Sequence, residues 1–277
     1  MLALQSLLPA ARTGGITVLS YHAVRPTEAP FNVHTVTPDA FERHMAFLAS
    51  NYEIIALDDA PAALASPDDG VRRVVVTFDD AYRDIVEYAY PVLEQYGITA
   101  TVFVPTGFVG EPTVMTVNQM RDMRAGGLVR FGSHTVTHPD MRRLDRGELW
   151  YETLVSRRVL EQWLGESVTT FAYPFGQRHN LSRAAAQAVV EAGYTIAVTA
   201  CWGTRNRPDR PLELHRIFLD TADNPAALEA KLEGSGDWRT WKAAAGYAAR
   251  RITGQLRNAA AAGLLTTVVS DLSVLVG

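Results

Sequence analysis

The sequence predicts an α/β protein whose main domain is a distorted or incomplete parallel (β/α) barrel, followed by a helical appendage. Short β-branched runs alternate with amphipathic helical segments in about seven units between residues 16 and 220. This alternation is typical of βα units wound in one hand around a curved parallel sheet. The alternative is an open doubly wound sheet. It is disfavoured because no glycine-rich phosphate loop follows the first apolar run.

The composition is that of an ordinary globular protein. Apolar residues make up 47% and charged residues 20% of the 277 positions, with a formal net charge of -4. This near-neutral balance does not favour a nucleic acid as partner. Cys201 is the only cysteine, which excludes an intrachain disulfide and a multi-cysteine zinc site. A metal site would therefore use histidines and carboxylates.

The order of elements follows from apolar periodicity and helix-end signals. Thr37 and Pro38 are typical of an N-cap and a first helical position, and Gly97 is typical of a helix end. In the first half we expect strands over 16–21, 53–57, 71–78, 99–105 and 128–134, and helices over 37–49, 83–97 and 118–127. In the second half we expect strands over 169–173, 195–200 and 212–220, and helices over 146–164 and 181–193.

Three regions are expected: a lead segment over 1–15, the barrel domain over 16–222 and a helical appendage over 223–277. The appendage is rich in alanine and arginine with interspersed tryptophans. That pattern favours packing on its own domain, with peripheral contact to a membrane surface as the alternative. No long apolar run and no secretory signal is evident, so the sequence predicts a cytoplasmic or membrane-peripheral protein.

Polar side chains stand at the ends of several predicted strands. His22 ends the first strand, Asp79 and Asp80 end the strand over 71–78, and His134 ends the strand over 128–134, with His138 four residues later. Functional groups of a parallel barrel gather at the carboxyl ends of its strands. We therefore expect two carboxylates and three imidazoles to meet at one rim.

The spacing of these residues indicates a metal centre. His134 and His138 can face one ion if the segment between them makes a helical turn. Two histidines and one carboxylate with an open position are a common catalytic zinc ligand set, and Co²⁺, Ni²⁺ or Mn²⁺ also fit. Asp79 and Asp80 would repel each other at the end of an apolar strand without a cation. One of them could instead cap a helix beginning at Ala81.

Three segments carry a family resemblance: TFDDAY (77–82), SHTVTH (133–138) and FAYPFG (171–176). In this order and spacing they resemble the polysaccharide deacetylase family, the NodB-homology domain of carbohydrate esterase family 4. The opening LSYHAV resembles the branch that deacetylates poly-N-acetylglucosamine. The resemblance covers roughly residues 16–220 and implies a distorted (β/α) barrel.

The resemblance also implies roles for individual residues. Asp79 would be the general base, and Asp80, His134 and His138 would hold a divalent metal, most often Zn²⁺. The backbone N–H of Phe175 would stabilise the oxyanion. The substrate would be an N-acetylated sugar or glycan, which points to the cell envelope although the missing signal points inward.

Two histidines compete for the role of general acid. His215 lies in LELHRIFL and is similar to a late Leu-x-His motif of many family members, whereas His22 ends the first strand. We favour His22 on its strand-end position, because His215 followed by Arg216 suits a packed or hydrogen-bonded histidine. Ala172 stands where the family often has an arginine that supports the base. The support of Asp79 is therefore left unassigned.

Four further residues are expected near the substrate. Tyr173, Pro174 and Phe175 follow one strand in the FAYPFG motif and could form a wall of the sugar groove. Trp202 follows another strand and could stack on a sugar ring or pack in the core.

The leading functional hypothesis is a hydrolase that removes acetyl groups from N-acetylated sugars or polysaccharides. One alternative is the hydrolysis of another amide or of an O-acetyl ester on the same scaffold. The other is a catalytically silent carbohydrate-binding domain. A base retained beside a complete ligand set argues against the silent domain.

Overall fold

The structure is a computed structural model that describes residues 15–26, 34–66 and 70–236. The predicted lead segment up to residue 14 lies outside the described residues. The larger part of the predicted appendage, with its membrane contact, lies outside them as well.

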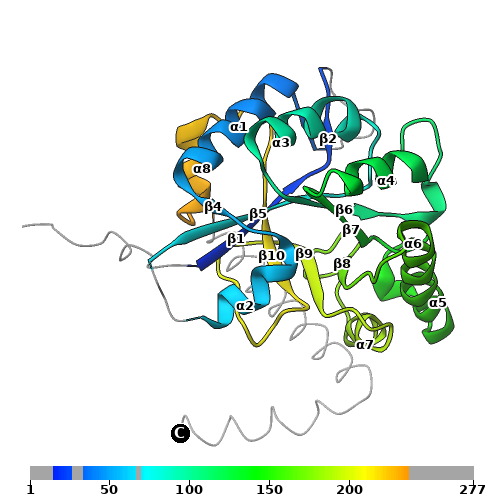
Figure 1. Ribbon diagram of the computed structural model, residues 1–277. Coiled ribbons are helices and arrows are strands. Elements are labelled where there is room, and N and C mark those ends of the chain that lie inside the picture. The colour runs from blue at the N-terminus through cyan, green and yellow to red at the C-terminus, as the bar shows by residue number, and fades with distance from the viewer. Residues whose placement is uncertain (1–14, 27–33, 67–69, 237–277) are drawn as a thin grey trace, which may run out of the picture. The chain divides into compact units, whose positions relative to one another are not determined.

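Seven parallel strands form a closed barrel, which confirms the predicted fold and shows that the barrel is complete (Figure 1). The first strand pairs with β10 on one side and with β5 on the other, and this second pairing closes the ring. In order around the barrel the strands are β1 (Gly15–Tyr21), β5 (Arg72–Phe78), β6 (Ala100–Val104), β7 (Val129–Ser133), β8 (Thr170–Ala172), β9 (Ile196–Trp202) and β10 (Leu214–Phe218).

Three short strands lie beside this ring. β4 (Glu53–Ile54) pairs with the first residues of β5, and β2 (Ala23–Val24) pairs with β3 (Thr35–Val36). The strand expected over 53–57 is thus only two residues long. It gives way to a 3-10 turn, η2 (Leu57–Asp59), and the short helix α2 (Ala60–Ala65).

The remaining helices surround the barrel (Figure 1). Helix α1 packs against both α3 and α8, α4 packs against α6, and α5 packs against α7. Their bounds are α1 (Pro38–Asn51), η3 (Ile85–Ala89), α3 (Tyr90–Tyr96), η4 (Thr106–Phe108), α4 (Val117–Ala125), η5 (Met141–Arg143), α5 (Arg146–Trp150), η6 (Tyr151–Val155), α6 (Ser156–Leu164), α7 (Arg183–Glu191) and α8 (Pro225–Leu232). Both η3 and η6 are π-helical turns.

Local signals begin and end these helices as expected. Thr37 and Pro38 stand at the N-cap and first position of α1, and Gly97 ends α3 with a φ of 63°. Glycine adopts this left-handed conformation without the steric cost of a Cβ atom.

Side chains alternate between two apolar cores because successive strand residues point to opposite faces. The outer core lies between strands and helices. The inner core fills the amino-terminal part of the barrel with residues such as Ile16, Val75 and Leu214. Leu57 and Ala60 join the inner core, so η2 and α2 cover that end of the barrel. The polar side chains that follow the strand ends therefore lie above an apolar barrel interior.

The barrel unit extends further along the chain than the boundary expected at residue 222. Leu228 and Leu232 of α8 are buried in the outer core, and the chain divides into compact units after Asp237. The physical reason is that α8 covers apolar surface of α1. Among the helices of the described ranges, none is long and apolar enough to cross a membrane.

Gly132 in β7 is required by the narrow barrel interior below the rim. A Cβ atom there would lie 2.4 Å from the Thr170 hydroxyl and 2.6 Å from the Phe103 ring. We expect Gly132→Ala to lower the free energy of unfolding in urea by about 1 to 3 kcal/mol, because overpacking forces neighbours out of position. Gly147→Ala is the matched control. A Cβ atom at Gly147, in α5, would have no neighbour closer than 3.4 Å, and alanine favours helix. Equal losses in both variants would contradict this account of Gly132.

Candidate metal and catalytic site

Asp79 and Asp80 follow β5 and lie at the rim in different surroundings. Asp79 is 3% exposed, and its N–H donates to the Tyr21 carbonyl, which extends the sheet by one residue. The chain then turns through two left-handed residues, Asp80 with φ 68° and Ala81 with φ 49°. The alternative that one aspartate caps a helix beginning at Ala81 is therefore excluded. This sharp turn brings the second carboxylate to the same rim as the first.

The two motif histidines lie on a loop that leaves β7. His134 donates its Nδ1 proton to the Ala172 carbonyl at 2.8 Å, since a carbonyl oxygen can only accept. Its Nε2 atom therefore carries the free lone pair, as is common in metal sites where a carbonyl binds the other ring nitrogen of the histidine. Thr135 has φ 70° and His138 has φ 55°, so the expected helical turn between the histidines is absent. A left-handed loop brings the imidazoles together instead.

Asp80, His134 and His138 offer three ligand atoms within 4.8 Å of one another. The two Nε2 atoms are 3.1 Å apart, and Asp80 Oδ1 is 3.7 Å from His134 Nε2 and 3.6 Å from His138 Nε2. Ligand atoms about 2.1 Å from a tetrahedral zinc ion lie roughly 3.4 Å apart. The donor set and its spacing thus fit a divalent ion.

The electrostatics of the rim also fit a cation. Burial and the neighbouring His138 lower the pKa of His134 to about 3, so its imidazole is neutral at pH 7. Burial, aided by the negative charge of Asp79, raises the pKa of Asp80 to about 7. A buried carboxylate beside a second one is stabilised by a positive charge. A bound metal would provide that charge to Asp80.

Asp79 receives its support from Arg216, a residue to which sequence reasoning gave no role. The two guanidinium NH groups donate to the two Asp79 oxygens at 2.7 and 2.6 Å, and Arg216 is 1% exposed. Burial alone would raise the pKa of Asp79, but the guanidinium holds it well below its usual range. Arg216 Nε donates to the Thr199 carbonyl, and this bond holds the guanidinium group in place inside the barrel.

Strand alternation in β10 is a sequence signal from which the inward position of Arg216 could have been predicted. In β10 the alternate residues Leu214 and Arg216 point into the barrel, whereas Ile217 joins the outer core. An arginine inside a small barrel needs a buried carboxylate as partner. Alternation counted from Leu214 therefore predicts a charge facing the rim from this strand, where the motif position Ala172 lacks one.

His22 and His215 lie in different places. His22 Nε2 is 3.8 Å from Asp79 Oδ2, and its ring contacts those of His34 and Phe218. Burial lowers the pKa of His22 to about 4, although the charge of Asp79 opposes this. His215 lies one residue from Arg216, on the opposite face of β10 by strand alternation, and packs against Gly203. The structure thus brings His22, and not His215, to the rim.

The expected substrate residues also separate. Phe175 is 56% exposed, has φ 58°, and its ring centre is 4.9 Å from that of His138. Pro174 is buried beneath it. Tyr173 belongs to the outer core, where its ring contacts Phe171. Trp202 packs beside Lys231 and Gly236, away from the ligand cluster. Only Phe175 among these aromatic residues borders the metal ligands.

Residues 66–197 match the family model described as polysaccharide deacetylase. The Bacillus subtilis (strain 168) protein YxkH, whose name assigns it to the polysaccharide deacetylases, is 28% identical over 79% of this chain and 76% of its own. Poly-beta-1,6-N-acetyl-D-glucosamine N-deacetylase of Staphylococcus aureus (strain MRSA252) is 31% identical over 38% of this chain and 41% of its own. The Streptococcus pyogenes deacetylase PplD, solved in complex with acetate, has a TM-score of 0.72 and 26% identity, covering 80% of this chain and 99% of that one.

The pair of Asp79 and Arg216 can be tested by a double-mutant cycle in urea. We expect Arg216→Met to lower the free energy of unfolding by about 3 to 5 kcal/mol, because it leaves a buried carboxylate without its partner. Adding Asp79→Leu removes the unpaired charge and is expected to recover much of that loss. Arg158→Met is the control, since Arg158 is paired with Glu161 on the surface. Additive losses in the double variant would contradict the coupling.

Proposed function

Because the chain belongs to the polysaccharide deacetylase family, a family of hydrolases that act on non-peptide C–N bonds, we propose that it removes acetyl groups from N-acetylated sugars or polysaccharides with a divalent metal. The observation that carries the proposal is the cluster of Asp80, His134 and His138 directly beside a buried, arginine-paired Asp79. Zn²⁺ is the proposed ion on the basis of this ligand set, and Co²⁺, Ni²⁺ or Mn²⁺ would also fit.

Amide hydrolysis requires an activated water, stabilisation of the carbonyl oxygen and a proton for the departing amine. Bound between Asp80, His134 and His138, the metal would supply the charge that activates water and polarises the acetyl carbonyl. The remaining needs fall to groups of the chain itself.

Asp79 is the proposed base. Arg216 keeps its carboxylate ionised and holds both oxygens in one orientation, so the base is ready to accept a proton from water. A carboxylate fixed in this way loses little entropy when the reaction geometry is reached. The proposed role of the Phe175 N–H is to stabilise the oxyanion from the turn after β8.

His22 is the proposed general acid. With a pKa lowered to about 4, its imidazole is neutral at pH 7 and lacks the acidic imidazolium proton before the reaction begins. Asp79 lies 3.8 Å away and holds a proton once water has been deprotonated. We therefore propose that the proton passes from the water through Asp79 and His22 to the amine nitrogen, which leaves as the C–N bond breaks.

The substrate class follows from the chemistry and from the family. Phe175 presents an exposed ring next to His138, where the face of an N-acetylated sugar could rest. The sugar's acetamido group would then point between Phe175 and the ligand cluster. An N-acetylated glycan is the proposed partner, and the described rim provides no basis for nucleic acid.

Acetate release from N-acetylglucosamine oligomers tests the function. We expect protein loaded with Zn²⁺ or Co²⁺ to release acetate, and a chelator to abolish the release. Asp79→Asn is expected to lower kcat by a factor of about 10² to 10⁴, because an amide cannot accept the water proton. Metal content and thermal stability of the variant are measured alongside. Stoichiometric metal without acetate from any N-acetylated glycan would refute the deacetylase proposal.

His22→Ala and His215→Ala discriminate between the two candidates for proton donor. We expect His22→Ala to lower kcat about 100-fold or more, because the amine would leave without general acid catalysis. His215→Ala is expected to keep kcat close to that of the unchanged protein, since its ring lies against Gly203 on the outer face of β10. The two variants are compared at equal metal occupancy and in the same buffer. Equal losses of kcat would show that neither histidine has the special role.

A further inference from the structure

Glu152 is a buried acidic residue outside the barrel, for which the proposed reaction has no use. It lies on the π-helical turn η6 and is 6% exposed. A buried carboxylate requires hydrogen-bond donors, because it has lost its water. Its partners therefore show what it serves.

Within the described part of the chain, the hydrogen-bond donors to its carboxylate all belong to the loop between His134 and His138. Glu152 Oε2 accepts from the backbone N–H of Val136 at 2.7 Å and from that of Thr137 at 3.0 Å. Its other oxygen, Oε1, accepts from the Thr137 hydroxyl at 2.6 Å. One carboxylate thus holds two of the three residues that separate the histidines.

This loop has a conformation that its own residues disfavour. Thr135 and His138 both have positive φ values, which side chains with a Cβ atom rarely adopt. Such strain persists only where surrounding contacts determine the conformation. A hydrogen bond of 3.0 Å from the His138 N–H to the Thr135 hydroxyl also stabilises the turn, but it lies within the loop. The backbone N–H groups of Thr106 and Gly107 in η4 donate to the Thr135 and Val136 carbonyls. Glu152 is the side chain that binds the loop amides and ties the loop to η6.

We propose that Glu152 is a positioning residue for the metal centre: by binding the Val136 and Thr137 amides it holds the loop that sets the separation of His134 and His138. The inference rests on the proposed function in one respect, namely that His134 and His138 bind a divalent metal ion. The consequence is that the turn η6, outside the barrel wall, determines the affinity of the rim for its ion.

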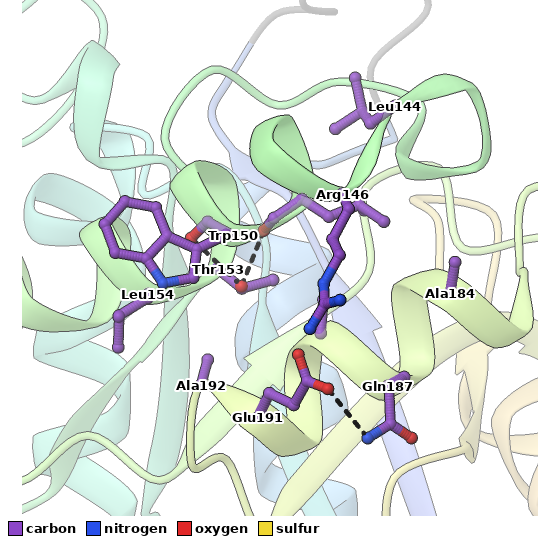
Figure 2. A pocket seen from close by; sticks show the side chains of 11 residues that line it. Leu144, Arg146, Trp150, Thr153, Leu154, Ala184, Gln187, Glu191 and Ala192 are labelled. Atoms are coloured by element: carbon purple, nitrogen blue, oxygen red, sulfur yellow. Dashed lines mark hydrogen bonds between the residues drawn. The ribbon is translucent and has the colours of Figure 1, made fainter.

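The same turn provides a matched control on its outer side. Thr153 lines a groove of about 450 Å³ between the α5–η6 segment and α7 (Figure 2). Its hydroxyl is bonded to carbonyl oxygens of its own helix, those of Leu149 and Trp150, as the dashed lines in Figure 2 show. Thr153 is at least as buried as Glu152, and among the described residues its hydroxyl bonds the Leu149 and Trp150 carbonyls and not the histidine loop. Thr153→Val therefore perturbs the turn without removing the anchor.

The test compares the full chain with Glu152→Ala, Glu152→Gln and Thr153→Val. Zn²⁺ affinity is measured by competition with a chromophoric chelator. The visible spectrum of bound Co²⁺ reports ligand geometry, and amide hydrogen exchange over residues 135–138 is measured without metal. We expect Glu152→Ala to raise the Kd for Zn²⁺ about 10- to 100-fold and to speed exchange, as loss of second-shell support does. Glu152→Gln keeps an acceptor oxygen and is expected to show a smaller loss.

Thr153→Val is expected to leave the Kd, the Co²⁺ spectrum and the exchange unchanged even if its thermal stability falls. The proposal is overturned if Glu152→Ala alters neither affinity nor exchange, or if Thr153→Val alters both as much. Amide exchange in the metal-free protein tests whether Glu152 holds the loop, even if the chain binds no metal. Acetate release tests the deacetylase activity separately. Tight Zn²⁺ binding without acetate release would therefore refute the deacetylase proposal without refuting the role of Glu152.

Discussion

The bidentate pair of Arg216 and Asp79 is the interaction on which the site depends. It joins β10 to β5 through the barrel interior, between strands that are separated by β1. The pair keeps a carboxylate ionised where burial would otherwise protonate it. The negative charge of Asp79 adds to the effect of burial in raising the pKa of Asp80, and it opposes the effect of burial in lowering the pKa of His22. This buried ion pair therefore keeps Asp79 ionised and also influences the protonation of Asp80 and His22.

Backbone strain is concentrated in the loops that surround this pair. Among the described residues, every non-glycine position with positive φ lies in one of the three motif segments at the rim: Asp80, Ala81, Thr135, His138 and Phe175. The barrel below provides the rigidity that makes such conformations tolerable, since closed parallel strands leave the loop ends little freedom. These turns bring the side chains of Asp80, His138 and Phe175 together at the rim, where strands continued in extended conformation would not place them.

The order of strands and helices could be read from apolar periodicity, because each βα unit is encoded by residues close in sequence. The meeting of Asp80, His134 and His138 could be predicted for a related reason: the carboxyl ends of parallel strands lie at one rim, whatever conformation the loops adopt. Arg216 was missed because its partner Asp79 is 137 residues away and the role of a charge inside a strand depends on which face it occupies. Tyr173 is expected near the substrate but packs in the layer outside the barrel, since a one-residue step reverses the face. Of the two places expected for Trp202, the structure has the one against the core and not the one beside a sugar ring. The left-handed turns could not be predicted, because the residues that adopt positive φ there are not glycines.

The apolar filling of the barrel has a consequence for how reactants move. Ile16, Val75, Leu214 and their neighbours occupy the interior below the rim, and Leu57 with Ala60 covers the far end. In the proposed reaction, sugar and water would therefore reach Asp79 from the same side, and acetate would leave through the opening by which the glycan entered. A polymer would lie across this opening with both of its ends free, so that its length is not limited by the depth of the barrel. Acetate would then have to leave, and the next water would have to enter, through the same opening that the bound polymer covers.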